Sequence, residues 1–456
     1  MLIKLLVLLI VVISILKYNI ILFNNYFENN KNYLNLNIKL NSSLFNKIIN
    51  KIKIGTFTYY LENGGRSRII SFLLNNLYRI KIFNLYLFSI KIKDDNEYLI
   101  QKNINRILIK NYNINNLIKS ILKKKLDVFI YHFSQNDEIE ALNKLKKNIK
   151  ILLYQHQSIF FWIYTNFTSF KYLYKSYKES KYIVSLIHLE NDYIFEKWGI
   201  KSIFMNNFMT YEYNSSFQLD LFSKTILMIG RLDNKYKRLV LGLQAMEYIT
   251  NEIPEIEMKV IGNITNNLYL MNIINILGLD KNIKFYGYTP IPEKYFKNVS
   301  LNIITSISES FCLVLSETKI YGIPNIVINL EYISILNGGT VIIYDDSPEF
   351  IAKESIKILL NDELRRKLGK EARKSIRKFK NEILLKKWIK LILSVYNGND
   401  YYEKLRKLYT KITENKSLKL LKNQILFLRK KNKNLKYITL KNIVNFTFLE
   451  NVKISF

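Results

Sequence analysis

The 456-residue sequence has few of the residues that build disulfides, zinc sites and tight turns. It contains 1 cysteine, 3 histidines, 14 glycines and 5 prolines. The single cysteine, Cys312, excludes an intramolecular disulfide bond and favours a reducing compartment. The histidines are too few and too dispersed for a dedicated zinc site. We therefore expect neither a disulfide framework nor a metal site.

Acidic residues are scarce relative to basic ones. Aspartate and glutamate number 37 against 69 lysines and arginines, which gives a formal net charge of +32 at pH 7. Such a surface attracts anionic head groups, nucleic acids or phosphorylated substrates. The basic residues are scattered and form no nucleic-acid-binding module, so we do not expect nucleic acid as a partner. A hydrophobic content of 49% is enough for a large core and argues against global disorder.

The N-terminus carries a long apolar stretch that lacks a small-residue cleavage site after it. An apolar run covers residues 5–16, and residues 20–23 continue it after Lys17. Together they approach the roughly 20 residues needed to span a bilayer. We predict an uncleaved anchor over 1–23 and a polar linker over 24–50, hence a membrane-associated, single-pass protein with a cytosolic catalytic part. A cleaved signal or an apolar helix lying on a membrane or domain is the alternative.

Alternating strand-like and helical patterns follow. Apolar runs at 53–60, 83–90, 104–109, 128–133, 149–154 and 182–187 are mostly separated by helical patterns, which predicts an open α/β domain over 51–222. A polar segment and a new strand at 225–230 predict a second α/β domain over 223–380. A helix is expected over 381–398. The basic tail over 399–456 is either an amphipathic helix on a membrane surface or a solvated helical extension.

The stretch over residues 300–330 is the most informative. The run Leu301–Ile307 predicts a buried strand, a loop holding Glu309 follows, and a helical segment from Leu313 contains Glu317. In parallel sheets, ligands bind at the carboxyl ends of the strands, and the free N–H groups at a helix start bind phosphate. A nucleotide-sugar could place its phosphate on this helix start and its hydroxyls on the two carboxylates. A surface helix with two ordinary glutamates is the alternative.

A glycine pair and a basic loop follow two other predicted strands. In a glycine-poor chain, Gly64-Gly65 permits a tight turn and close approach of the backbone to a ligand, although a plain turn is the alternative. The loop over residues 231–238 carries two arginines and two lysines, which suit a diphosphate. A solvated basic loop is the alternative, above all for Lys235.

Two of the three histidines directly follow predicted strands. His156 could hydrogen-bond a sugar hydroxyl or stabilise developing charge, with a structural role as the alternative. His132 is a weaker candidate of the same kind, and His188 is expected to be structural.

The segment with the two glutamates, in particular SESF, LVLSE and YGIP, resembles the E-x7-E segment of retaining GT-B glycosyltransferases of family 4, the group 1 glycosyl transferases. The glycine pair at 64–65, the GRL and KR of residues 230–238, and a late pair, Gly338-Gly339, occur in the order of that family. The resemblance covers about residues 51–398. It implies a GT-B fold, in which two Rossmann-like domains face a cleft and the helix over 381–398 crosses back to the first domain. The family usually carries glycine where this chain has Cys312.

The resemblance also implies an activity and a set of roles. The reaction would move a sugar from a UDP- or GDP-linked nucleotide-sugar to an acceptor hydroxyl, with retention of the anomeric configuration and without a metal or other cofactor. Glu309 would hold sugar hydroxyls, His156 would lie near the reacting sugar, and Glu317 would bind the ribose. The donor phosphates would contact Gly64, Gly65, Arg231, Lys237, Phe311, Cys312 and Leu313.

The expected acceptor is a glycan or a lipid-linked, membrane-proximal acceptor. Two other functions stay open at this point. One is a non-catalytic GT-B protein that binds nucleotide-sugars or acts as a scaffold, an alternative that Cys312 supports. The other is a GT-B sugar-nucleotide epimerase, against which the E-x7-E segment argues.

Overall fold

The computed structural model describes residues 51–398, except for 63, 92–96, 133–137, 166, 212–222, 232–234, 264–266, 331–332 and 334. The predicted anchor over 1–23, the linker over 24–50 and the basic tail over 399–456 lie outside the described residues. The domain boundaries that we drew from the sequence stay predictions.

The described part of the chain offers no helix that could cross a membrane. None of its helices combines the length and the apolar character that a crossing requires. The longest of them, α14 (Asn381–Asn397), has 17 residues and buries apolar side chains such as Trp388 within the protein. This finding corrects the predicted membrane-associated, single-pass location, which rested on the hydropathy of residues 1–23 alone.

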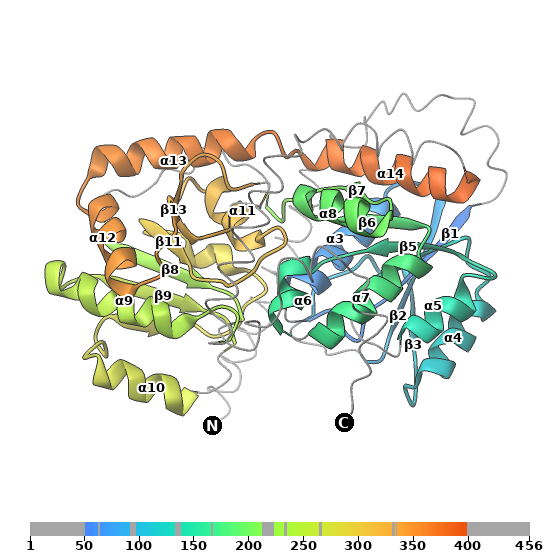
Figure 1. The fold of residues 1–456 in the computed structure, drawn as a ribbon, viewed down its shortest axis with the longest axis horizontal. Coiled ribbons are helices and arrows are strands. Elements are labelled where there is room, and N and C mark those ends of the chain that lie inside the picture. Colours follow the sequence, from blue (N-terminus) through green and yellow to red (C-terminus); the bar gives the residue numbers. More distant parts are fainter. Residues whose placement is uncertain are drawn as a thin grey trace, which may run out of the picture. The chain divides into compact units, whose positions relative to one another are not determined.

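The first half of the described chain forms a seven-stranded parallel sheet (Figure 1). Its strands lie in the order β3 (Asn105–Leu108), β2 (Phe83–Ser89), β1 (Ile52–Phe57), β4 (Val128–Tyr131), β5 (Lys150–Tyr154), β6 (Tyr182–Ser185) and β7 (Ile203–Phe204). The connecting helices are α3 (Gly65–Tyr78), α4 (Ile114–Lys123), α5 (Glu138–Leu145), α6 (Ile159–Thr165), α7 (Phe167–Glu179) and α8 (His188–Trp198).

The second half forms a six-stranded parallel sheet. Its strands lie in the order β10 (Ile283–Phe285), β9 (Glu257–Ile261), β8 (Thr225–Ile229), β11 (Leu301–Ile304), β12 (Asn325–Ile328) and β13 (Thr340–Ile343). Its helices are α9 (Leu239–Glu252), α10 (Asn267–Ile276), the 3-10 turn η2 (Pro292–Tyr295), α11 (Leu313–Ile320), α12 (Pro348–Leu359) and α13 (Asp362–Ile376). The two parallel sheets confirm the predicted α/β fold class.

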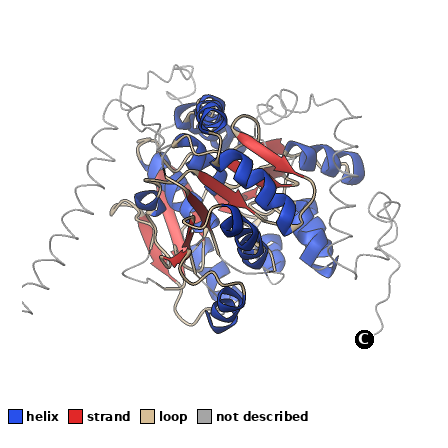
Figure 2. Cartoon of the chain, turned by 90° about the vertical axis from the view of Figure 1, so that its left-hand side faces the viewer, coloured by secondary structure: helices blue, strands red, loops and turns tan. Residues whose placement is uncertain are grey.

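The central strands are short apolar runs because helices cover both of their faces, as Figure 2 shows. All four residues of β4, β6, β11 and β12 are buried. A strand buried on both sides reads as a continuous apolar run rather than as an alternating one. This is why the sequence pattern located these strands well.

The strand order reverses once in each sheet, between β1 and β4 and between β8 and β11. In open parallel sheets a ligand binds outside the carboxyl ends of the strands at such a reversal, because the two adjoining loops turn to opposite faces. Four loops are therefore singled out by topology alone, namely those that follow β1, β4, β8 and β11.

Helix α14 joins the C-terminal end of the described chain to the first sheet. It contacts β4, β5 and α3, and Figure 1 shows it at the edge of the half that holds the first sheet. The Trp388 ring packs edge-on against the Tyr154 ring, with 4.9 Å between centroids. At its start, the Asn381 side chain accepts a hydrogen bond from Met209 N (2.7 Å) and donates one to Met209 O (2.8 Å).

Candidate functional site

An acid and a base from neighbouring loops meet at the reversal of the second sheet. Lys237 follows β8, Glu309 follows β11, and the Lys237 ammonium pairs with Glu309 Oε1. The Ser306 hydroxyl donates to the same carboxylate oxygen over 2.8 Å. Although burial opposes it, the Glu309 carboxylate raises the pKa of Lys237. An ion pair therefore connects the loop after β8 to the loop after β11.

Arg238 fixes the backbone that carries Lys237. Its φ of 50° places it in the left-handed region at the start of α9. Its guanidinium donates from Nε to Thr305 O (2.6 Å) and pairs with Asp346 (2.5 Å), while the Thr305 hydroxyl donates back to Lys237 O (2.5 Å). Sequence reasoning counted Arg238 among the cations of the loop. The structure instead gives it a framework role, which its position next to a helix start does not reveal.

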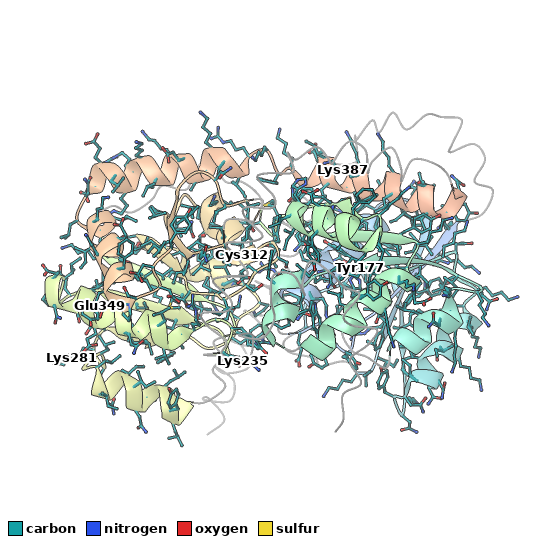
Figure 3. All side chains as sticks on the ribbon, viewed as in Figure 1. Tyr177, Lys235, Lys281, Cys312, Glu349 and Lys387 are labelled. Atoms are coloured by element: carbon teal, nitrogen blue, oxygen red, sulfur yellow. The ribbon has the colours of Figure 1, made fainter. Side chains whose placement is uncertain are left out.

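The two other cations of this loop flank one aromatic ring. The Arg231 guanidinium lies 5.8 Å and the Lys235 ammonium 5.2 Å from the centroid of the Tyr236 ring. Arg231 is close enough to Lys237 to oppose the rise in the pKa of Lys237. Lys235 is exposed, and Figure 3 shows where it lies. The Tyr236 ring also contacts the Phe161 ring of α6, with 5.1 Å between centroids.

Cys312 stands at the start of α11 in a backbone conformation that favours glycine. Its φ is 62° and its ψ is 78°, in the left-handed region. The side chain is buried. Burial and the charge of Glu309 raise the pKa of the thiol, whereas the charge of Lys237 lowers it. The thiol therefore lies within the electrostatic influence of both Lys237 and Glu309, and Figure 3 labels Cys312 on the ribbon. This conformation explains in physical terms why glycine is the usual residue here in the family that the sequence resembles.

The starts of two helices approach each other beside this pair. Gly65 begins α3, and a Cβ atom added to it would lie 3.1 Å from Leu313 Cδ1, at the first residue of α11. Gly64 precedes with a φ of 142°, and Phe311 is buried. Each helix start presents N–H groups without an intrahelical partner and the positive end of the helix dipole. The predicted glycine pair and the predicted phosphate-binding helix start are thus brought together.

His156 is paired with the other strand-end histidine. Nδ1 of His132, after β4, lies 2.7 Å from Nε2 of His156, after β5. The Ser310 hydroxyl donates to His156 O over 2.5 Å and links this loop to the one that carries Glu309. Burial and the nearby charge of Arg66 lower the pKa of His156 to about 3. At neutral pH both rings are uncharged, so the pair can exchange hydrogen bonds with a ligand but brings no positive charge.

Glu317 is buried on α11 and contacts a residue that sequence reasoning missed. Arg68 of α3 donates from its guanidinium to Glu317 Oε1 over 2.6 Å, and the Thr210 hydroxyl donates to the same oxygen over 2.7 Å. Burial raises the pKa of the Glu317 carboxyl, while Arg68 and Thr210 oppose that rise. The signal that could have found Arg68 is its place one turn after the glycine pair, on a helix whose start lies beside the start of α11.

The structure therefore gathers the predicted residues in two connected groups. The first surrounds the Lys237–Glu309 pair and the start of α11, and the second surrounds Glu317 further along the same helix. Within the described chain, no cluster of three or more His, Cys, Asp or Glu side chains could hold a metal ion. The roles assigned to these residues, and the expectation of chemistry without a metal, stay predictions.

Two doubly wound sheets whose reversal-point loops offer helix starts and cations define a class of α/β proteins suited to a phosphorylated ligand. Within this class, residues 212–375 match the family model described as "Glycosyl transferases group 1". The match confirms the predicted resemblance to the group 1 glycosyl transferases, whereas family 4 and a retaining reaction stay predictions.

Two curated relatives are named as glycosyltransferases. One is an "Uncharacterized glycosyltransferase" of Haemophilus influenzae, 24% identical over 226 residues, which are 48% of this chain and 62% of the relative. The other is the poly(ribitol-phosphate) alpha-N-acetylglucosaminyltransferase of Staphylococcus aureus, 24% identical over 168 residues, 35% of this chain and 33% of the relative. The chain thus spans less than two thirds of either relative.

Solved structures show a similar fold. Sucrose-phosphate synthase from Thermosynechococcus elongatus has a TM-score of 0.64 at 12% identity, covering 76% of this chain and 100% of the other. HepE of Anabaena, in complex with UDP and glucose, has a TM-score of 0.59 at 12% identity, covering 75% and 99%. A TarM variant of S. aureus, in complex with Fondaparinux, alpha-GlcNAc-glycerol and UDP, has a TM-score of 0.53 at 20% identity, covering 61% and 58%. At such identities the likeness concerns the fold alone, and it confirms a GT-B-like α/β fold.

Proposed function

We propose that this chain is a glycosyltransferase that moves a sugar from a UDP- or GDP-linked nucleotide-sugar to an acceptor hydroxyl, with retention of the anomeric configuration. The observation that carries the proposal is the Lys237–Glu309 ion pair at the start of α11, where two reversal-point loops meet. The family match over residues 212–375 supports it. So do the names of the curated relatives and the UDP in the HepE and TarM complexes.

The donor diphosphate would bind at the start of α11. The backbone of Phe311, Cys312 and Leu313 precedes and begins this helix, and its free N–H groups suit phosphate oxygens. Lys237 and Arg231 supply positive charge from the neighbouring loop. Across from them, the start of α3 at Gly64 and Gly65 adds a second helix dipole of the same sign.

Donor binding would redistribute the charges of the Lys237–Glu309 pair. Without a ligand, the ammonium is neutralised by the carboxylate. A diphosphate beside Lys237 would compete for that ammonium, because it carries more negative charge than one carboxylate. Glu309 would then accept hydrogen bonds from sugar hydroxyls instead. One pair of residues would thereby hold both ends of the bond that breaks.

The transfer step needs charge stabilisation more than it needs a strong base. The bond between the anomeric carbon and the phosphate oxygen breaks, and the acceptor oxygen bonds to that carbon from the same face. The acceptor proton passes to the departing phosphate. Lys237, Arg231 and the helix start would stabilise the negative charge that develops there, and the neutral His156 would hydrogen-bond the sugar without opposing its positive charge.

The partners follow from this chemistry. They are a nucleotide-sugar and a glycan acceptor, with no nucleic acid and, in our proposal, no metal ion. Glu317 would bind the ribose of the donor. A lipid-linked acceptor stays a prediction of the sequence.

One observation favours a second candidate function, a non-catalytic protein that binds nucleotide-sugars. Cys312 places a side chain in a left-handed position where the family usually has glycine. If this side chain holds the phosphate away from the helix start, the protein would bind a donor without transferring its sugar. Turnover of a labelled donor by the wild type would exclude this candidate. A Cys312→Gly variant that gains transfer activity absent from the wild type would establish it.

The testing experiment measures the melting temperature with UDP, GDP, ADP and their sugars. A ligand that binds only the folded state stabilises by about 2.7 kcal/mol at one hundred times its dissociation constant. We expect a selective rise for one nucleotide that is lost in Lys237→Ala. Lys235→Ala is the matched control, because Lys235 is an exposed lysine of the same loop. It should keep the rise, apart from a modest electrostatic loss.

Three outcomes decide the proposal. A selective rise that depends on Lys237 and turnover of the labelled sugar support it. A rise without turnover points to the non-catalytic candidate. No rise with any nucleotide at millimolar concentration overturns the proposed function.

A further inference from the structure

Both hydrogen bonds that the structure gives the Glu317 side chain end on one oxygen. Arg68 NH1 donates to Oε1 over 2.6 Å, and Thr210 Oγ1 donates to Oε1 over 2.7 Å. From the part of the chain that the structure describes, Oε2 receives no hydrogen bond. The Glu317 side chain is nearly buried, but its Oε2 is not among the fully enclosed atoms without a partner, so a ligand can reach it. A ligand hydroxyl is the donor that the proposed function supplies for it.

Arg68 is itself held in one orientation. Its guanidinium lies 4.9 Å from the centroid of the Tyr211 ring and 6.0 Å from that of the Tyr98 ring. Its side chain is 14% exposed, against 1% for Glu317. A planar guanidinium packed against rings loses less conformational entropy when it forms a hydrogen bond than a flexible ammonium does. The contact therefore fixes where Oε1 lies and, through it, where Oε2 points.

Arg68 also opposes protonation of the carboxylate. Burial raises the pKa of Glu317, and the Arg68 charge is the largest opposing cause, followed by the Thr210 hydrogen bond. Without Arg68, a buried Glu317 would bind a proton more readily. An ionised carboxylate accepts hydrogen bonds only, which suits the two vicinal hydroxyls of a ribose. A protonated one would turn one of its oxygens into a donor.

We propose that Arg68 is a positioning residue for recognition of the donor ribose, which orients Glu317 from the first α/β half so that Oε2 accepts hydrogen bonds from the ribose hydroxyls. The inference rests on the proposed function and deepens it. It makes nucleotide affinity in the second half depend on a residue 249 positions earlier in the chain. A purely structural ion pair would instead support folding and leave ribose recognition unchanged.

The test compares affinity for a nucleotide with affinity for its 2′,3′-dideoxy counterpart. Dissociation constants are measured by calorimetry for UDP, GDP and ADP and for the three dideoxy forms, with the full chain. A hydrogen bond to a charged group predicts that wild type prefers the ribose form about 10- to 100-fold. The variants are Arg68→Ala, Arg68→Lys, Glu317→Gln and the double variant Arg68→Ala with Glu317→Gln.

Arg106→Ala is the matched control. Arg106 forms an ion pair with Glu97 at 2.5 Å, and its side chain is 15% exposed, close to the 14% of Arg68. Arg106 lies on β3, away from α11. This variant should lower the melting temperature as Arg68→Ala does and should keep the full preference for ribose. The comparison separates the loss of a largely buried ion pair from the loss of ribose recognition.

We expect Arg68→Ala and Glu317→Gln each to reduce the preference below about threefold, and the double variant to reduce it no further. Arg68→Lys should keep part of the preference. The inference is overturned if Arg68→Ala lowers the melting temperature but keeps the preference, or if Glu317→Gln leaves it intact while wild type still binds the nucleotide. In both cases the proposed function stands. If the wild type binds no nucleotide, both the proposed function and this inference are overturned.

Discussion

Nδ1 of His132 lies 2.7 Å from Nε2 of His156, so the two strand-end histidines share one hydrogen bond inside the protein. Their rings are stacked at an angle, with 4.8 Å between centroids. One ring must donate and the other must accept. A proton added to the accepting nitrogen would place two N–H groups face to face, close to the positive charge of Arg66. The pair is therefore stable only in its neutral form.

This relationship predicts that the histidine pair destabilises the protein as the pH falls below about 6.5. Burial and Arg66 lower the pKa of His156 from 6.5 to about 3. The unfolded chain therefore binds more protons than the folded one as the pH falls from about 6.5 to 3, and stability falls with it. One such histidine contributes up to about 1.36 kcal/mol per pH unit. Buried Glu190, whose pKa is raised to about 8, acts in the opposite direction, so the slope of His156 is measured as the difference between wild type and His156→Gln in urea unfolding at pH 7, 6 and 5.

The control for this prediction is the third histidine. His156→Gln should flatten the slope, whereas His188→Gln, which leaves the pair intact, should keep it. A slope that is equal in wild type and His156→Gln would contradict the prediction.

The backbone at Cys312 predicts an unusual order of tolerated side chains. A left-handed φ disfavours any Cβ by about 1–2 kcal/mol and disfavours β-branched residues most. Cys312→Gly should remove that strain but also lose the contacts of the buried thiol. The two effects offset each other, so the stability of this variant should stay within about 1 kcal/mol of wild type. Cys312→Val should be less stable than wild type by about 2 kcal/mol or more. Equal stability of the glycine and valine variants in urea unfolding would refute this interpretation.

Lys319 is a buried amine, its pKa lowered by burial to about 7, that donates hydrogen bonds to one loop. Its Nζ donates to the carbonyl oxygens of Ile335 (2.6 Å), Leu336 (2.9 Å) and Asn337 (2.8 Å), just before the late glycine pair. Lys319→Met would leave these buried acceptors without their donor, at a cost of about 2–4 kcal/mol. Lys284→Met is the control, because Lys284 is 57% exposed in its pair with Glu257 and should change stability by less than about 1 kcal/mol. Comparable losses in both variants would count against this account.

Gly339 packs so closely against α13 that no side chain fits at this position. Its φ is 64°, and an added Cβ would collide with Ala372 Cβ and Leu368 O and lie 2.5 Å from Ala372 N. Gly339→Ala should therefore destabilise the protein by about 2–5 kcal/mol, the sum of backbone strain and overpacking. Gly398→Ala shares the positive φ, 72°, but meets nothing within 4 Å, so it isolates the strain at about 1–2 kcal/mol. Thermal unfolding of both variants measures the difference.

Elements whose signal is local were predicted well. The apolar run at 225–230 became β8 (Thr225–Ile229), and the helical segment from Leu313 became α11 (Leu313–Ile320). A strand that is buried on both faces is recognisable as a short apolar run. A helix is recognisable from its periodicity and its end residues. Both patterns lie within about ten residues. The sequence pattern is weaker for the exposed edge strand β3 and for the two-residue strand β7. The sequence analysis did not predict β7.

The sequence by itself determined the kinds of element, their order and the residue types offered at each strand end, because backbone propensity and hydrophobic periodicity act over short distances. Only the tertiary structure decided which of these residues meet. That Arg68 contacts Glu317, that His132 contacts His156 and that Lys237 pairs with Glu309 depend on the strand order of both sheets and on how their loops pack. Such contacts join residues that are 24 to 249 positions apart, over which a single sequence carries no periodic signal.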